Sequence, residues 1–177
     1  MKRVIVAILT VACAAPAFAQ GPSSSNAAVA TNSARPAYDA AKRFITRAAE
    51  EVPEATYAFK PTPDVRSFGQ LVGHIANANY MICSVALGEQ SPSRENIEQA
   101  RTTKTALVEA LKASFTYCDR AYAMPDAQLT QPADLFGMKM SRLGVLSFNA
   151  AHDYEHYGNI VTYMRLNGMT PPSSAGR

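Results

Sequence analysis

The sequence has 177 residues, of which 47% are hydrophobic and 18% charged, a composition ordinary for one globular domain with a buried core. The formal net charge is +3, and it falls to +1 without Lys2 and Arg3, which lie in a segment that we expect to be removed. The charges are also evenly scattered. Neither nucleic acid nor an anionic membrane surface is therefore expected as a partner.

The N-terminus has the pattern of a secretory signal peptide covering residues 1–19. A basic start is followed by an apolar run at residues 4–15 and by the small-x-small sequence Ala17-Phe18-Ala19, after which cleavage would leave Gln20 as the first residue. The run is too short to span a membrane, so we expect an exported, periplasmic protein without stable membrane insertion after cleavage. Two alternatives are lipoprotein processing at Cys13 and an uncleaved anchor.

Beyond the signal peptide, the chain divides into a leader, one domain and a tail. Residues 20–35 are small and polar and are predicted to be a flexible leader, residues 36–170 form the domain, and residues 171–177 are a tail. A first helix is predicted from Pro36 to Val52, because proline suits a first helical turn and apolar residues follow at helical spacing. An irregular connection follows, imposed by Pro53, Pro61 and Pro63.

The second and third helices are predicted with different precision. The second begins after Ser67, a plausible N-cap, and ends at Leu87, where Gly88 follows as a stop. The third is predicted to begin near Ser93. Its core-facing stripe comprises Leu107, Leu111, Phe115, Cys118 and Tyr122. Residues 124–137 contain two prolines and are predicted to be mostly loop.

The fourth helix is the clearest and is predicted from Ser141 to Asn167. Gly168 is expected as a left-handed cap, and the pair Pro171-Pro172 prevents continuation. At about 1.5 Å per residue such a helix is about 40 Å long, which is the full height of a bundle. With four helices and no convincing strand alternation, the sequence predicts an all-α fold, a four-helix bundle.

Two cysteines remain after signal cleavage, Cys83 and Cys118. In an oxidising compartment they could form a disulfide, but two cysteines alone do not show that they meet. A disulfide and two separate buried thiols both remain open.

The chain has only three histidines, His74, His152 and His156. The last two are four apart on the fourth helix, so their Cβ atoms lie on one face about 6 Å apart. His74 lies in the second helix, which could face the fourth across the bundle. A chance H-x-x-x-H pair is common, but burying three unpartnered imidazoles would be costly, whereas a shared metal ion satisfies them together. We therefore predict a divalent metal, Zn or Ni first and Fe, Mn or Cu as alternatives, with coordination positions left open.

A competing motif overlaps this histidine pair. Residues 152–156 (HDYEH) fit the H-x-x-E-H zinc signature of inverted metalloproteases. Those enzymes need a further acidic ligand downstream, yet no Asp or Glu follows Glu155, and the chain is too small for that architecture. The protease interpretation is disfavoured. Glu155 itself is either a general base, a hydrogen-bond acceptor beside the ligands, or a partner in a surface ion pair.

The histidine segments resemble the DinB-like (DinB/YfiT) family. Residues 67–76 (SFGQLVGHIA) look like its first-histidine helix, and residues 152–168, from HDYEHYGN through YMRLNG, look like its last helix. The resemblance extends over about residues 37–173. It implies a four-helix bundle, commonly a homodimer, whose divalent metal is held by His74, His152 and His156. Asn159 stands where the family usually has Gln.

Three functions are compatible with these features. The first is a metal-dependent hydrolase of an unknown small-molecule substrate, in which Glu155 or Tyr163 assists proton transfer. The second, implied by the resemblance alone, is a thiol-dependent S-transferase or isomerase, although the thiols that such enzymes use are mainly cytosolic. The third is a non-catalytic, stress-related protein that binds a metal or small ligand; Met81, Tyr157 and Tyr163 could line a pocket, although such residues are more often core.

Overall fold

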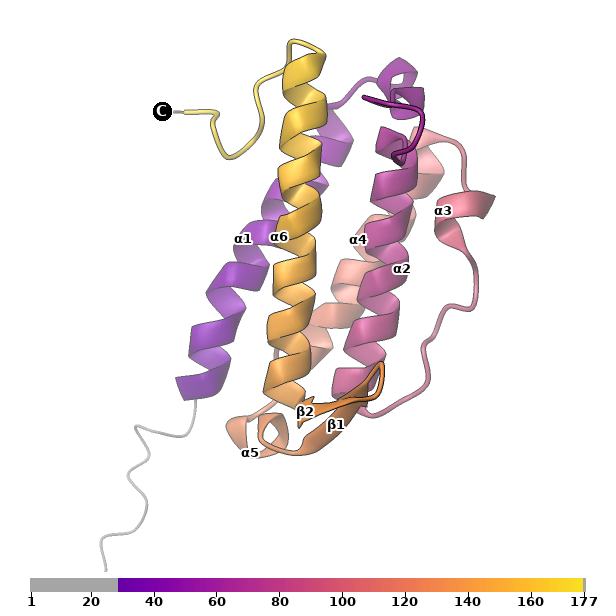
Figure 1. Cartoon of the computed structure of the whole chain (residues 1–177). Coiled ribbons are helices and arrows are strands. Elements are labelled where there is room, and N and C mark those ends of the chain that lie inside the picture. Colours follow the sequence, from indigo (N-terminus) through magenta and orange to yellow (C-terminus); the bar gives the residue numbers. More distant parts are fainter. Residues whose placement is uncertain (1–28, 177) are drawn as a thin grey trace, which may run out of the picture.

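Four long helices pack side by side in the computed structural model, which describes residues 29–176 (Figure 1). Helix α2 packs against α4 and α6, and α1 packs against the same two helices. The predicted all-α four-helix bundle is confirmed. The predicted signal peptide and the first part of the leader lie outside the described residues. The bundle helices are α1 (Val29–Glu51), α2 (Phe68–Leu87), α4 (Lys104–Ala121) and α6 (Arg142–Leu166).

Within residues 29–176, no helix combines the length and apolarity that crossing a bilayer would require.

Helix α1 begins at Val29, seven residues before the predicted start, so residues 29–35 are helical rather than part of a flexible leader. The backbone N–H groups of a first helical turn have no partner within the helix. Here the Asp126 carboxylate accepts bonds from Ala30 N (2.9 Å) and Thr31 N (3.1 Å). Because this cap comes from a residue almost a hundred positions away, local composition could not reveal it. Pro36 lies inside the helix.

Helix α2 has the predicted boundaries because both its ends are set by local contacts. Ser67 and Gln70 form a capping box, in which Ser67 N donates to Gln70 Oε1 (2.9 Å) and Gln70 N donates to Ser67 Oγ (3.2 Å). Gly88 ends the helix at φ 73°, in the left-handed region that favours glycine. A short 3₁₀ segment, η2 (Glu54–Ala58), precedes α2 in the proline-rich connection.

The third helix was predicted to begin near Ser93, and this prediction is wrong. Residues 89–103, which we call the strap, instead run alongside α2 and contain only the short helix α3 (Ile97–Ala100) (Figure 1). The bundle helix α4 begins at Lys104, with Thr103 as its N-cap. The five residues of its predicted core stripe are nonetheless all buried, which confirms that part of the prediction.

The strap is held on α2 by a side chain that the helix itself supplies. Asn77 donates to the Glu95 carbonyl (2.8 Å) and accepts from the Glu98 backbone N–H (3.1 Å). Gly73 makes the close approach possible, because a Cβ at this position would lie 2.7 Å from the Cα of Glu98. These long-range contacts, which helical periodicity does not report, explain why the strap was mistaken for a helix.

Residues 124–141 are more ordered than the predicted loop. They form the short helix α5 (Asp126–Leu129) and a hairpin of β1 (Pro132–Leu135) and β2 (Met138–Ser141), paired antiparallel with Leu135 opposite Met138. The two-residue turn Phe136-Gly137 has positive φ at both positions (56° and 80°), as type I′ hairpin turns do. Pro132 is tolerated because it is the first residue of its strand.

The end of α6 follows the prediction, but the tail does not remain apart from the bundle. Ser141 caps the start of the helix, and after its end Met169 N donates back to the Met164 carbonyl (2.9 Å) around Gly168 at φ 71°. Pro171 and Pro172 are buried. Ser173 N then donates to the Tyr157 hydroxyl (2.9 Å), which fastens the segment to α6.

Cys83 of α2 and Cys118 of α4 form a disulfide with a Cα–Cα distance of 5.3 Å, and both residues are fully buried. The structure therefore selects the disulfide from the two interpretations left open by the sequence. It joins these two helices, and Cys83 lies on the side of α2 opposite His74, nine residues along the helix.

Candidate metal centre

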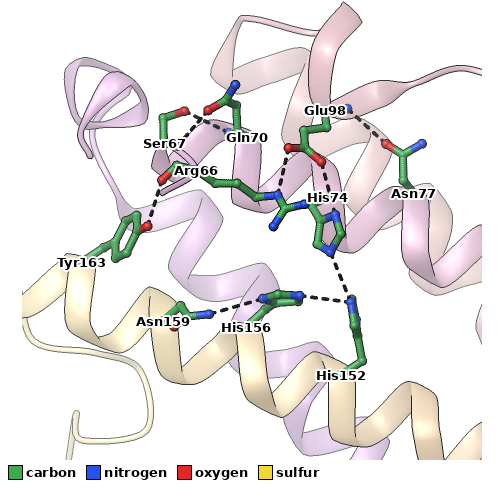
Figure 2. Close-up of polar contacts among 10 residues, drawn as sticks. All are labelled: Arg66, Ser67, Gln70, His74, Asn77, Glu98, His152, His156, Asn159 and Tyr163. Atoms are coloured by element: carbon green, nitrogen blue, oxygen red, sulfur yellow. Dashed lines mark hydrogen bonds and ion pairs between the residues drawn. The ribbon is translucent and has the colours of Figure 1, made fainter. Parts of the chain in front are cut away.

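The three histidines converge between α2 and α6, as the sequence predicts (Figure 2). His152 is in the middle: its Nε2 lies 3.3 Å from Nε2 of His74 and 3.0 Å from Nε2 of His156. One ring nitrogen from each histidine lies within 4.8 Å of the others. The four-residue spacing places two of them on one face of α6, and the packing of α2 against α6 supplies the third.

The two separations around His152 match those of neighbouring ligands on one ion. With metal–nitrogen distances of about 2.0–2.1 Å, two imidazole nitrogens on a shared ion are separated by about 2.9 Å at a right angle and about 3.4 Å at a tetrahedral angle. The two separations fall in this interval, and all three nitrogens lie within 4.8 Å of one another. Because each neutral imidazole carries one proton, hydrogen bonds among the three rings cannot engage every converging lone pair. The donor set could therefore hold a divalent ion.

Burial keeps the three rings in the neutral form that metal ligation requires. Desolvation is the largest cause in each case: it lowers the pKa of His74, lowers that of His152 to about 4 and lowers that of His156 to about 3. The neighbouring histidines and the Arg66 guanidinium act in the same direction on His152 and His156. At neutral pH each ring is therefore uncharged and has one nitrogen with a free lone pair.

Glu98, on the strap, orients His74 from behind. With Nε2 of His74 turned toward the other rings, Nδ1 carries the proton and donates to Glu98 Oε2 at 3.2 Å. The other carboxylate oxygen accepts from Arg66 Nε at 2.9 Å, so an Arg66–Glu98–His74 chain fixes the tautomer of the ring (Figure 2). Sequence reasoning missed both charged residues, because only the path of the strap across Gly73 brings Glu98 to this position.

The outer nitrogens of the two α6 histidines have different surroundings. The Asn159 side-chain amide lies 3.4 Å from Nδ1 of His156, so the residue that departs from the expected Gln still contacts a candidate ligand. Nδ1 of His152 is buried and has no hydrogen-bond partner among residues 29–176. Of the three rings, His74 is thus held by the strongest, charge-assisted contact.

The two predicted proton-transfer residues line a polar pocket beside the centre, together with His156, Asn159 and Arg66, and its volume is about 600 Å³. Glu155 is exposed, and no hydrogen bond or ion pair engages its carboxylate within the described chain. The Tyr163 hydroxyl donates to the Arg66 carbonyl at 2.8 Å, and burial raises the pKa of this tyrosine. The catalytic roles of Glu155 and Tyr163 remain predictions.

A second pocket of about 630 Å³, which we call the apolar pocket, opens on the other side of the centre. His74 and His152 form part of its wall, and Glu98 lines both pockets. Met81 of α2, Phe148 of α6 and Phe136 at the hairpin tip also line the apolar pocket. The three histidine nitrogens therefore lie between a polar and an apolar space.

Comparison with known proteins places these residues in a recognised group. The family model of the DinB superfamily matches residues 37–160, which include all three histidines. The protein YjoA of Bacillus subtilis is 28% identical over 130 residues, covering 69% of this chain and 80% of YjoA.

Solved structures of DinB-like proteins share the fold. One from Bacillus cereus superposes with a TM-score of 0.70 at 18% identity, covering 80% of this chain and 95% of the other. The structure of Bacillus subtilis YjoA gives 0.61 at 21% identity, covering 78% and 94%. At these identities the structural similarity shows the fold alone.

Proposed function

The chain belongs to the DinB superfamily, and from this premise we propose that it is an exported, metal-dependent hydrolase of a small molecule. The observation that carries the proposal is the convergence of three neutral histidine nitrogens, separated by 3.0 and 3.3 Å, between two pockets. Hydrogen bonds among three neutral rings cannot engage every converging lone pair, and a shared cation would engage them.

His74, His152 and His156 would hold the divalent ion. Three imidazoles suit Zn or Ni, and Fe, Mn and Cu are also compatible with this donor set. A bound ion supplies Lewis acidity, which acidifies water and polarises a carbonyl or phosphoryl oxygen. With only three protein donors, positions remain open toward the pockets, as in catalytic rather than structural sites.

The other residues have distinct roles in the proposed reaction. Glu155 accepts a proton from water, because its carboxylate is unpaired within the described residues and borders the same pocket as His156. Glu98 and Arg66 hold the His74 ring in its ligating tautomer. Tyr163 positions the Arg66 backbone through its hydroxyl, which keeps this chain of contacts in register with α6.

Export is proposed from two independent features. The N-terminal sequence has the pattern of a cleavable signal peptide. The buried disulfide between Cys83 and Cys118 adds a structural reason, since disulfides persist in oxidising compartments. Export also favours hydrolysis over thiol transfer, because water needs no cytosolic thiol as cosubstrate.

Metal content is the first test. The mature chain, purified without chelator, should contain close to one divalent ion per chain by elemental analysis, and His74→Ala and His152→Ala should each lose it. Tyr154→Ala is the matched control, because Tyr154 lies on α6 beside His152 but is exposed and lines neither pocket. A wild-type protein that retains no more Zn, Ni or Mn than His152→Ala after reloading would contradict the metal centre.

Activity and export require separate measurements. Metal-loaded protein is assayed with esters, amides, lactones and phosphoesters; Glu155→Gln should lower kcat by about a hundredfold or more while metal content is unchanged. Activity that appears only with an added thiol would instead favour the transferase. Mass spectrometry of the N-terminus in a cell fraction should give Gln20 as the first residue, and an intact Met1 would contradict the cleaved signal peptide.

A further inference from the structure

We propose that the apolar pocket binds an aromatic or branched alkyl group of the substrate, while the polar head of the same molecule reaches the histidine centre. The inference rests on the proposed function and specifies its substrate class. A volume of about 630 Å³ is in the range of small-molecule sites.

The position of the pocket connects it to the chemistry. Phe148, His152 and His156 follow one another at four-residue spacing along a single face of α6. Phe148 and His152 both line the apolar pocket, and His156 continues the row toward the polar pocket. A molecule whose apolar part lies against Phe148 therefore has its other end within one helical turn of the candidate metal.

The pocket is lined by large apolar side chains that are exposed to solvent, which is unfavourable unless a ligand covers them. Eight large hydrophobic side chains are exposed among the described residues, and three of them line this pocket: Met81 (39%), Phe136 (63%) and Phe148 (36%). They come from α2, the hairpin and α6, so the clustering results from the tertiary structure. Contiguous exposed apolar surface of this kind is typical of a binding site.

The backbone of Phe136 gives a second, independent argument. Its φ of 56° lies in the left-handed region, where a residue other than Gly, Asn or Asp is strained. Type I′ turns strongly favour Asn or Gly at this position. Phe136 gains only an edge contact with Phe148, at 6.2 Å between ring centroids, and stays mostly exposed. A ligand in the pocket would provide the missing burial.

The charges around the pocket restrict the ligand further. Its two carboxylates are already neutralised, because Glu95 pairs with Arg101 at 2.8 Å and Glu98 pairs with Arg66 at 2.9 Å. Arg94 is the remaining charged residue of the lining, and it has no ion pair within residues 29–176. The pocket thus suits neutral or anionic molecules with an apolar group rather than cationic amines.

Two hydroxamates distinguish the contribution of the apolar tail to binding from that of the metal-binding group. Acetohydroxamate and phenylacetohydroxamate share the metal-binding group and differ only in the apolar tail. Calorimetry on zinc-loaded protein should show that the phenyl compound binds at least about tenfold more tightly, because its ring is removed from water. Phe136→Asn, which suits the turn, should abolish this preference and leave acetohydroxamate affinity unchanged.

Met138→Thr is the matched control, since Met138 is exposed on the same hairpin but does not line the pocket; it should retain the preference. Equal affinities of the two hydroxamates for wild type, with zinc-dependent binding of both, would overturn the pocket and leave the proposed metal centre intact. Loss of the preference in Met138→Thr as well as in Phe136→Asn would also overturn it. If neither compound binds zinc-treated protein more tightly than His152→Ala, the proposed function fails together with this inference.

Discussion

Two polar clusters lie between α2 and α6, and they differ in how their hydrogen-bonding groups are satisfied. The first is the histidine centre. The second, which we call the asparagine layer, is fully inside the bundle: Asn149 Nδ2 donates to Asn79 Oδ1 at 2.8 Å, and Asn79 Nδ2 contacts Ser114 Oγ at 3.4 Å. The Tyr122 hydroxyl lies 3.0 Å from Asn149 Oδ1 and donates to the Leu146 carbonyl at 2.7 Å.

The difference separates a structural cluster from a binding cluster. In the asparagine layer donors meet acceptors, so burial costs little and the network fixes how the helices pack. In the histidine centre the protons of neutral imidazoles cannot engage every converging lone pair, so a shared cation would add stability. We therefore expect changes in the asparagine layer to lower the free energy of unfolding and to leave metal binding unchanged. Changes around the histidines should weaken metal binding and have little effect on the stability of the metal-free protein.

The largest expected effect concerns the disulfide, which packs on the asparagine layer with Cys118 Sγ 3.3 Å from the Asn79 carbonyl oxygen. It links residues 35 apart, so its removal in a double variant, Cys83→Ala with Cys118→Ala, should lower the free energy of unfolding by about 4 kcal/mol. Urea unfolding measures the loss, and metal stoichiometry should stay unchanged. A reductant that leaves the urea midpoint of wild type unmoved would contradict this expectation.

The second prediction removes the central side chain of the asparagine layer. Asn149→Ala leaves the side-chain oxygen Oδ1 of Asn79 without its donor and opens a small cavity, so the free energy of unfolding should fall by about 2–4 kcal/mol. Under native conditions the variant should still bind metal as wild type does. Asn159→Ala is the control at an exposed position of the same helix and should change stability by less than about 1 kcal/mol. Loss of metal from Asn149→Ala, equal to that from His152→Ala, would show that the two clusters are not separate.

The sequence allowed α2 and α6 to be predicted well because their ends depend on neighbouring residues. Ser67, Gly88 and Ser141 act on backbone groups within a few positions, and the two histidines on α6 share a face by helical geometry alone. Since these two helices carry all three candidate ligands, the centre was predictable from local patterns together with one assumption, that α2 and α6 pack against each other.

The remaining features depend on contacts distant in the chain. Asp126 lengthens α1, and Asn77 and Gly73 hold the strap, so neither boundary follows from periodicity. The sequence did not indicate the hairpin, because its turn has Phe136 at the position where type I′ turns usually have Asn or Gly. Glu98 was missed for the same reason as the strap, although it contacts His74.

The third prediction tests Glu98 as the residue that positions His74. Glu98→Gln weakens the bond to Nδ1 and no longer favours the ligating tautomer, so metal affinity should fall by about 10–100-fold with little change in metal-free stability. Competition with a chromophoric chelator measures the affinity. Glu95→Gln is the matched control, because this neighbouring acid of the strap pairs with Arg101 and does not contact a histidine. Equal losses in the two variants would assign the effect to the strap as a whole.

The smallest expected change per step is a slope of stability with pH, and it comes from Asp153, which belongs to neither cluster. Its side chain is fully buried, and both carboxyl oxygens lack a hydrogen-bond partner among residues 29–176. Burial raises the pKa of Asp153 well above its usual value, so the folded chain keeps a proton that the unfolded chain releases above about pH 4. Stability should therefore fall as pH rises, by up to about 1.4 kcal/mol per pH unit, until the folded pKa is reached.

Asp153→Asn cannot release this proton, so it should gain stability relative to wild type as pH rises from about 4 through that window. Urea midpoints of the two metal-free proteins, measured across the same pH series, give the difference directly, and contributions from the histidines cancel because both proteins contain them. Parallel profiles would mean that the Asp153 carboxyl titrates alike in the folded and unfolded chains, and that a partner or water satisfies it. Profiles that diverge would instead show that burying the Asp153 carboxyl costs stability. Neither a hydrogen-bond network, as in the asparagine layer, nor a shared cation then offsets this cost.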